Sequence, residues 1–181
     1  LSRVLANLAN FTGADLTDTK FVEANISNGK LISATMLRTK FDKADMSSVT
    51  ATASIFTEIE ATGADLSYAN FAGSTLRKGN FRGSLMLLTH LDTSTIYNTD
   101  FTDALMQYST YNSTTFYSPN LTNADMTGAN FINATLNWVT ATNTNFTSSI
   151  FTNVTATNFL AEKAKFDKAN ISKSTFAIFK A

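Results

Sequence analysis

The stretch ADMTGANFINATL, residues 124–136, contains the pattern from which the whole chain is built: a small residue, then Asp, Asn or Thr, then a large apolar residue, then two polar or small residues. Steps of five from Met126 reach Leu1 in one direction and Ala181 in the other, and every position on the way is Ala, Leu, Ile, Met, Phe or Tyr. Hydrophobic residues make up 44% of the chain, so chance would place them at fewer than half of these positions. The pentapeptide period therefore indicates a structural repeat.

A period of five fits neither the 3.6-residue period of a helix nor the two-residue period of a strand. The backbone must therefore bend once in every repeat to keep the large apolar residue, the central residue, on the inside. Short extended pieces separated by turns form a solenoid whose coils stack about 4.8 Å apart through backbone hydrogen bonds. The sequence predicts a core made from columns of central residues.

A second inward position lies two residues before each central residue, where Ala, Ser, Thr or Gly is usual. Wherever this residue is large and apolar, the central residue that follows is Ala. The pairs are Val4 with Ala6, Val49 with Ala51, Ile59 with Ala61, Val139 with Ala141, Val154 with Ala156, Phe159 with Ala161, and Phe179 with Ala181. Such an exchange of volume is what two columns in one close-packed interior require.

Eight triplets carry a family resemblance: Ala14-Asp15-Leu16, Ala24-Asn25-Ile26, Ala44-Asp45-Met46, Ala64-Asp65-Leu66, Ala69-Asn70-Phe71, Ala124-Asp125-Met126, Ala129-Asn130-Phe131 and Ala169-Asn170-Ile171. They resemble the A(D/N)LXX signature of the pentapeptide-repeat proteins, and the resemblance covers the entire chain. It implies an all-β fold, a right-handed quadrilateral parallel β-helix of about nine coils with four pentapeptides each. It also implies one domain over residues 1–181. The chain departs from the family by using Thr where Asp or Asn is usual.

A coil of four pentapeptides aligns like residues on one side of the rod. Thr75, Thr95, Thr115, Thr135, Thr155 and Thr175 form one column. Beside it, Tyr97 lies one coil from Tyr117, and Arg38, Glu58 and Lys78 alternate in charge, which is favourable between neighbouring strands. A triangular coil of three pentapeptides would scatter these columns. We therefore predict the square coil.

The composition argues against several classes of function. Formal net charge is zero and the pI is about 6.8, so we expect no nucleic-acid partner. No run of about 18 apolar residues is present, so we expect no membrane-spanning segment. The single His, His90, occupies an outward position and the chain contains no Cys. We therefore predict no catalytic residues, no metal site and no cofactor. Gly63, Gly73 and Gly83 lie two residues after central positions, where we expect a corner that demands a small residue.

Large apolar residues at outward positions are the candidate binding residues. Leu85 and Leu105 align one coil apart, with Leu87 and Leu88 beside them and Tyr108 close by. On the opposite side of a square coil, we expect Tyr97, Tyr117 and Trp138 to gather next to the Thr column. Contiguous exposed apolar groups mark partner sites more often than single ones do. The alternative is that these residues only pack at corners against neighbouring coils.

These observations favour a non-catalytic structural or protein-interaction module that forms part of a larger assembly or a longer chain. The terminal coils are apolar at Leu5, Leu8, Phe176, Ile178 and Phe179, and no cap is evident. We therefore expect flanking residues, a second copy or another subunit to cover the coil ends. One alternative is the DNA-mimicking, topoisomerase-protecting role of some family members, which zero net charge disfavours. Another is ice binding by the Thr array, which the irregular neighbouring column Arg77, Tyr97, Tyr117, Asn137, Thr157 disfavours.

Overall fold

A computed structural model describes residues 1–177, in which ten three-residue strands and no helix occur. The strands are β1 (Thr35–Leu37), β2 (Ile55–Thr57), β3 (Thr75–Arg77), β4 (Thr95–Tyr97), β5 (Thr115–Tyr117), β6 (Thr135–Asn137), β7 (Ile150–Thr152), β8 (Thr155–Thr157), β9 (Asn170–Ser172) and β10 (Thr175–Ala177). Ile178, the pair Phe179 and Ala181, and the predictions made from them lie outside the described residues.

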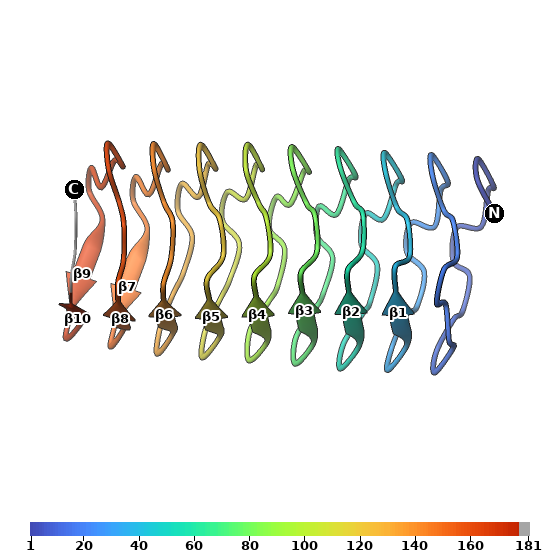
Figure 1. The fold of residues 1–181 in the computed structure, drawn as a ribbon, viewed down its shortest axis with the longest axis horizontal. Coiled ribbons are helices and arrows are strands. Elements are labelled where there is room, and N and C mark those ends of the chain that lie inside the picture. The colour runs from blue at the N-terminus through green and yellow to red at the C-terminus, as the bar shows by residue number, and fades with distance from the viewer. Residues whose placement is uncertain (178–181) are drawn as a thin grey trace.

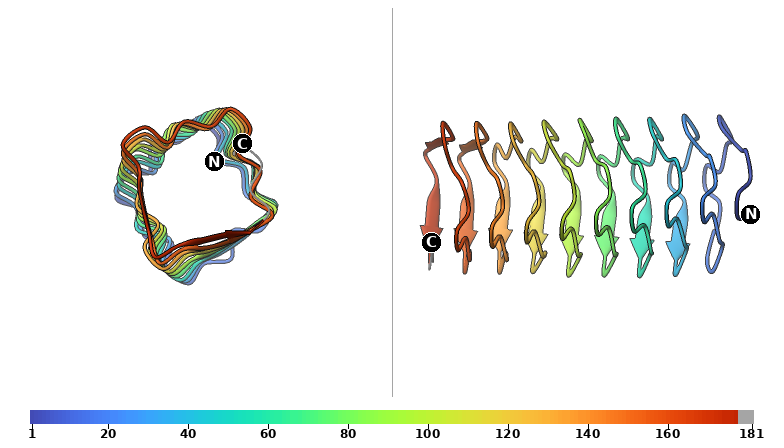
Figure 2. Two further views of the ribbon diagram at one scale, coloured as in Figure 1. Left: turned by 90° about the vertical axis from the view of Figure 1, so that its left-hand side faces the viewer. Right: turned by 90° about the horizontal axis from the view of Figure 1, so that it is seen from above.

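The strands stack in parallel, and each residue lies opposite the one four pentapeptides further along, as Thr75 opposite Thr95 and Tyr97 opposite Tyr117 show. One sheet has the order β1-β2-β3-β4-β5-β6-β8-β10, and β7 pairs with β9 on another side (Figure 1). Isolated parallel bridges with the same register, such as Leu85 with Leu105, join the coils elsewhere. Viewed along the rod, the coil has a four-sided outline (Figure 2). The predicted square β-helix is confirmed.

The number of regular turns is smaller than the number of coils expected. Seven turns of four pentapeptides each lead from Thr35 in β1 to Thr175 in β10. The prediction of about nine coils counted the whole length of the chain. Near the N-terminus the coils are joined by isolated bridges, such as Asp15 with Thr35, and contain no strand. The difference therefore comes from how the first coils pair.

The corners show that one sequence expectation was wrong. From Arg3 to Lys173, every residue two after a centre has positive φ, yet only Gly13, Gly63, Gly73, Gly83 and Gly128 are glycines. The others include Trp138 at 57°. The corner thus demands the left-handed conformation, which lets the chain turn, but not a small side chain, because the side chain points into solvent. A non-glycine residue in this conformation costs about 1–2 kcal/mol.

The core holds the two inward columns that the sequence predicts. Six of the seven exchange pairs lie in the described part of the chain. Five of them are fully buried, and Val4 with Ala6 is half-buried in the first coil. Aromatic rings stack along the columns, as Phe131 and Phe151 do with centroids 4.7 Å apart. The core is therefore a continuous apolar column along the rod.

Buried hydroxyl groups join successive coils. Ser or Thr two residues before a centre donates to the carbonyl oxygen of a central residue in the preceding coil, as Ser74 does to Ala51 at 2.6 Å. The same bond is made by Thr39, Ser54, Thr89, Thr99, Ser109, Thr114, Thr144, Ser149 and Ser174. From the sequence, these residues were expected only to be small. Their hydroxyls also satisfy buried backbone groups.

Ser74 and Ser94 provide a matched test of this bond because they occupy the same position in successive coils. Ser74 also accepts a hydrogen bond from the Ser54 backbone N–H, at 3.1 Å, whereas the buried Ser94 hydroxyl has no partner within residues 1–177. Ser74→Ala should lower the free energy of unfolding by about 1–3 kcal/mol, because it leaves two buried backbone groups unpaired. Ser94→Ala should be neutral or stabilising. Urea denaturation measures both, and equal losses would contradict the role of the hydroxyl.

Candidate interaction surface

On one side of the rod, the residue just before the centre makes the same hydrogen bond in several coils. Just before the central residue, Asn25, Asp45, Asp65, Asp125 and Asn145 each accept the backbone N–H two residues later, at 2.9–3.1 Å. In three of these coils the same oxygen also accepts the Ser or Thr hydroxyl at that later position. This bond explains why Asp or Asn precedes the centre, because its side chain holds the turn that follows.

Four coils lack Asp or Asn at this position: those of Leu5 and Lys165 near the ends of the rod, and two consecutive coils between them. Leu85 and Leu105 occupy the Asp/Asn position and lie opposite each other in neighbouring coils. A leucine side chain cannot accept the turn hydrogen bond, and these two remain 41% and 42% exposed. The repeat thus loses a local hydrogen bond and gains exposed apolar surface at the same place. Both side chains point away from the core, and each lies beside the other in the neighbouring coil.

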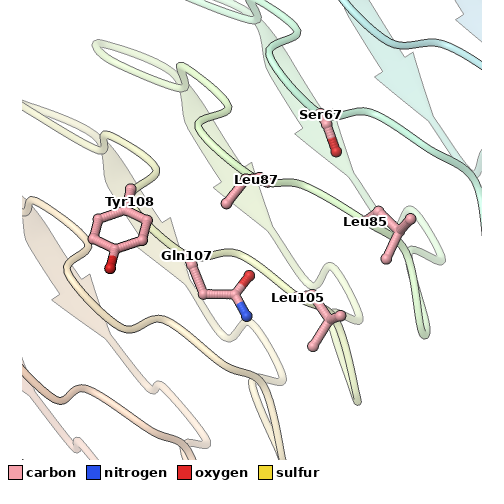
Figure 3. A pocket seen from close by; sticks show the side chains of 6 residues that line it. All are labelled: Ser67, Leu85, Leu87, Leu105, Gln107 and Tyr108. Atoms are coloured by element: carbon pink, nitrogen blue, oxygen red, sulfur yellow. The ribbon is translucent and has the colours of Figure 1, made fainter.

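The two leucines border an open hollow of about 380 Å³ (Figure 3). Its lining residues are Ser67, Leu85, Leu87, Leu105, Gln107 and Tyr108. Leu88, at the adjoining corner, is 36% exposed. We call Leu85, Leu87, Leu88, Leu105 and Tyr108 the leucine patch. The structure thus brings together all five residues of the first predicted group.

The corner beside the patch carries a third large residue that the sequence analysis missed. Tyr68, Leu88 and Tyr108 align in successive coils, all with positive φ, and both tyrosines are 56% exposed. The sequence contains a signal for Tyr68, because it lies four pentapeptides before Leu88, at the same position of the repeat. Large residues are uncommon in this conformation. Tyr68, Leu88 and Tyr108 enlarge the exposed apolar surface, although each adopts a left-handed backbone conformation that is unfavourable for a large residue.

Gly128 lies one coil beyond Tyr108 at the same corner. A Cβ atom built on Gly128 would lie 2.5 Å from Cδ1 and 2.6 Å from Cε1 of the Tyr108 ring. The Tyr108 ring therefore lies against Gly128, in the space that the Cβ atom of any other residue at position 128 would occupy. Gly128 positions the aromatic end of the patch.

The second predicted group lies on the opposite side, on the eight-stranded sheet. Tyr97 and Tyr117 stack with centroids 5.0 Å apart and an angle of 2° between the rings, and the Arg77 guanidinium lies 5.0 Å from the Tyr97 centroid. Trp138 is 55% exposed at a corner and makes no ring contact with either tyrosine among the described residues. The two tyrosines thus stack on each other, and Trp138 follows Asn137, the residue that pairs with Tyr117. The Tyr97 ring contacts Tyr117 and Arg77, whereas Tyr117 stacks on Tyr97 and remains 40% exposed.

Groups suited to catalysis do not converge within residues 1–177. His90 is exposed, and its Nδ1 lies 3.0 Å from the carbonyl oxygen of Leu88. Tyr111 is fully buried among aromatic rings, and burial raises the pKa of its phenol. No cluster of three or more His, Cys, Asp or Glu residues able to hold a metal occurs in this range, nor does any helix long and apolar enough to cross a membrane.

Comparison with known proteins agrees with this geometry. The family model for pentapeptide repeats matches eight copies, over residues 9–47, 44–83 and 112–147. The chain belongs to the pentapeptide-repeat family. The matched segments leave out residues 84–111, and this gap contains the entire leucine patch. Residues 1–8 and 148–181 also lie outside the matched segments.

Solved structures of QnrB1 share the fold. Two structures of trypsin-treated QnrB1, described as a plasmid-mediated fluoroquinolone resistance protein, have TM-scores of 0.76 and 0.77 at 16% and 15% identity. The alignments cover 92% and 97% of this chain and 90% and 92% of QnrB1. HetL, a pentapeptide-repeat protein from a Nostoc strain that is involved in heterocyst differentiation regulation, has a TM-score of 0.41 at 13% identity over 96% of this chain and 87% of its own. No curated protein sequence matches the chain.

The contact between Gly128 and Tyr108 can be tested against Gly83, which also has positive φ but has open space around it. Gly83→Ala should cost about 1 kcal/mol, because alanine is strained in the left-handed conformation. Gly128→Ala should cost the same and also push the Tyr108 ring away. In the NMR spectrum, one Gly128 α proton should show a ring-current shift that disappears in Tyr108→Leu. An unshifted proton in the unsubstituted protein would contradict this ring position.

Proposed function

We propose that this protein is a non-catalytic protein-interaction module and that the leucine patch is the surface that binds its partner. The observation that carries the proposal is the replacement of the turn-holding Asp or Asn by Leu85 and Leu105 in two successive coils. Leucines that give up a hydrogen bond and remain exposed are better explained by a partner than by stability. A rigid solenoid supports this use because its side chains occupy fixed positions in columns.

The two alternatives weighed from the sequence find less support. A DNA mimic requires a strongly acidic rod, yet the formal net charge is zero, and carboxylates such as Asp18 and Glu58 pair with Arg38 and Lys78. An ice-binding array requires a uniform flat face. The strand column beside the Thr residues instead contains Arg77, Tyr97, Tyr117 and Asn137 in successive coils. Similarity to QnrB1 at 16% identity supports the shared fold and not its role.

The double substitution Leu85→Asn and Leu105→Asn tests the proposal. Asn25 and Asn145 already occupy this column and hold the turn, so the variant should fold with a thermal midpoint within a few degrees of the original. Proteins that the immobilised chain captures from its native source should be lost, because the apolar contact is removed.

The matched control is Thr95→Asn with Thr115→Asn, two exposed positions on the opposite side of the rod. It should leave capture unchanged. Quantitative mass spectrometry of the bound fractions compares the three proteins. A folded leucine variant that captures the same proteins as the unsubstituted chain would refute the proposed function.

A further inference from the structure

Carboxylates lie at both ends of the leucine patch. Parallel bridges place Asp65, Leu85, Leu105 and Asp125 in one column in successive coils. Neither aspartate forms an ion pair with Lys or Arg in the described part of the chain, whereas Asp18, Glu23, Glu58 and Asp100 do. Asp125 is also the single charged residue of the stretch 104–161. The column therefore presents an apolar pair between two negative charges that have no cationic partner.

The side of the rod offers a partner side chains and not a strand edge. The backbone N–H groups of Leu85 and Leu105 already donate to the carbonyl oxygens of Ala64 and Ser84. The carbonyl oxygens of the two leucines accept hydrogen bonds from the N–H groups of Leu66 and Met86. An extended peptide that adds a strand needs free backbone groups. The partner must therefore bind through a surface of side chains, which an amphipathic helix provides.

From this charge pattern we propose that the patch binds a basic amphipathic helix of another protein, lying along the rod axis. This inference rests on the proposed function and specifies the partner. Coils stack about 4.8 Å apart, so three steps from Asp65 to Asp125 span about 14 Å. Three helical turns of about 5.4 Å span about 16 Å. On the partner helix, two apolar residues one turn apart face Leu85 and Leu105. A Lys or Arg lies one turn before the first apolar residue and another lies one turn after the second, so that each faces an aspartate.

A second copy of the chain fits this surface less well. In a two-fold dimer the same surface faces itself. With the axis across the rods, Leu85 faces the second chain's Leu105 and Asp65 faces its Asp125; with the axis along the rods, each residue faces its own copy. Like charges facing each other across an interface are unfavourable. The charges therefore favour a different, cationic partner.

The test uses synthetic helical peptides of about 20 residues and the full 181-residue protein. The first peptide carries two Leu one turn apart and a Lys one turn beyond each, in an Ala- and Gln-rich background. The second has Glu in place of both Lys. Fluorescence anisotropy at low salt should show the Lys peptide binding roughly tenfold more tightly than the Glu peptide, since exposed ion pairs contribute modestly.

Two protein variants assign the effect to the column. In Asp65→Asn with Asp125→Asn, the new Asn side chains can make the same turn hydrogen bond that Asn25 and Asn145 make. This variant should lose the preference for the Lys peptide. Leu85→Asn with Leu105→Asn should weaken binding of the Lys peptide at least tenfold. An unchanged preference in the first variant, or unchanged binding in the second, would overturn the inference.

The remaining outcomes separate this inference from the proposed function. If neither peptide binds at concentrations up to about 1 mM, or if both bind equally, the basic helix is wrong, even where the leucine variant loses its native partner. A dimer in sedimentation that depends on Leu85 and Leu105 would likewise overturn it in favour of a second copy. If the leucine variant keeps every captured protein, the proposed function itself fails.

Discussion

The whole structure depends on backbone hydrogen bonds that join each coil to the next, in a register of four pentapeptides. The backbone N–H of a central residue donates to a carbonyl oxygen in the next coil, as Phe41 does to Glu60 at 2.6 Å. The N–H of the residue before a centre donates to a carbonyl oxygen in the preceding coil, as Thr75 does to Ser54 at 2.9 Å. These bonds satisfy the backbone along the sides of the rod and align equivalent side chains. Because the pattern recurs in every pentapeptide, each side chain's direction follows from its place in the repeat.

Inward and outward positions therefore face different constraints. An inward position must fill volume, so Gly79 is small where a Cβ would lie 2.8 Å from the Phe81 ring and 3.3 Å from Ile59. An outward position must only let the turn form. An outward column can thus carry Asp, Asn or Leu without altering the core. The proposed partner surface lies where two such outward residues, Leu85 and Leu105, are apolar.

Features that depend on periodicity could be predicted from the sequence. The pentapeptide phase indicated the solenoid, the columns at steps of four pentapeptides indicated the square coil, and the outward leucines indicated the patch. Features that depend on local geometry were not predicted. The Ser74 hydroxyl looked like a size choice, Tyr68 was not singled out, and the corners of Gly63, Gly73 and Gly83 were expected to need a small residue. Trp138 itself was grouped with Tyr117 because column spacing alone does not show where a large side chain points.

Disulfide trapping tests the central claim, the coil of four pentapeptides, most directly because the chain contains no cysteine. Thr95 and Thr115 face each other in β4 and β5. At the strand spacing of about 4.8 Å, cysteines there lie within the Cα separation that a disulfide requires. Mass spectrometry after mild oxidation should find this bond in Thr95→Cys with Thr115→Cys and none in Thr95→Cys with Thr110→Cys. A bond in the second protein and not the first would indicate a coil of three pentapeptides and contradict the account.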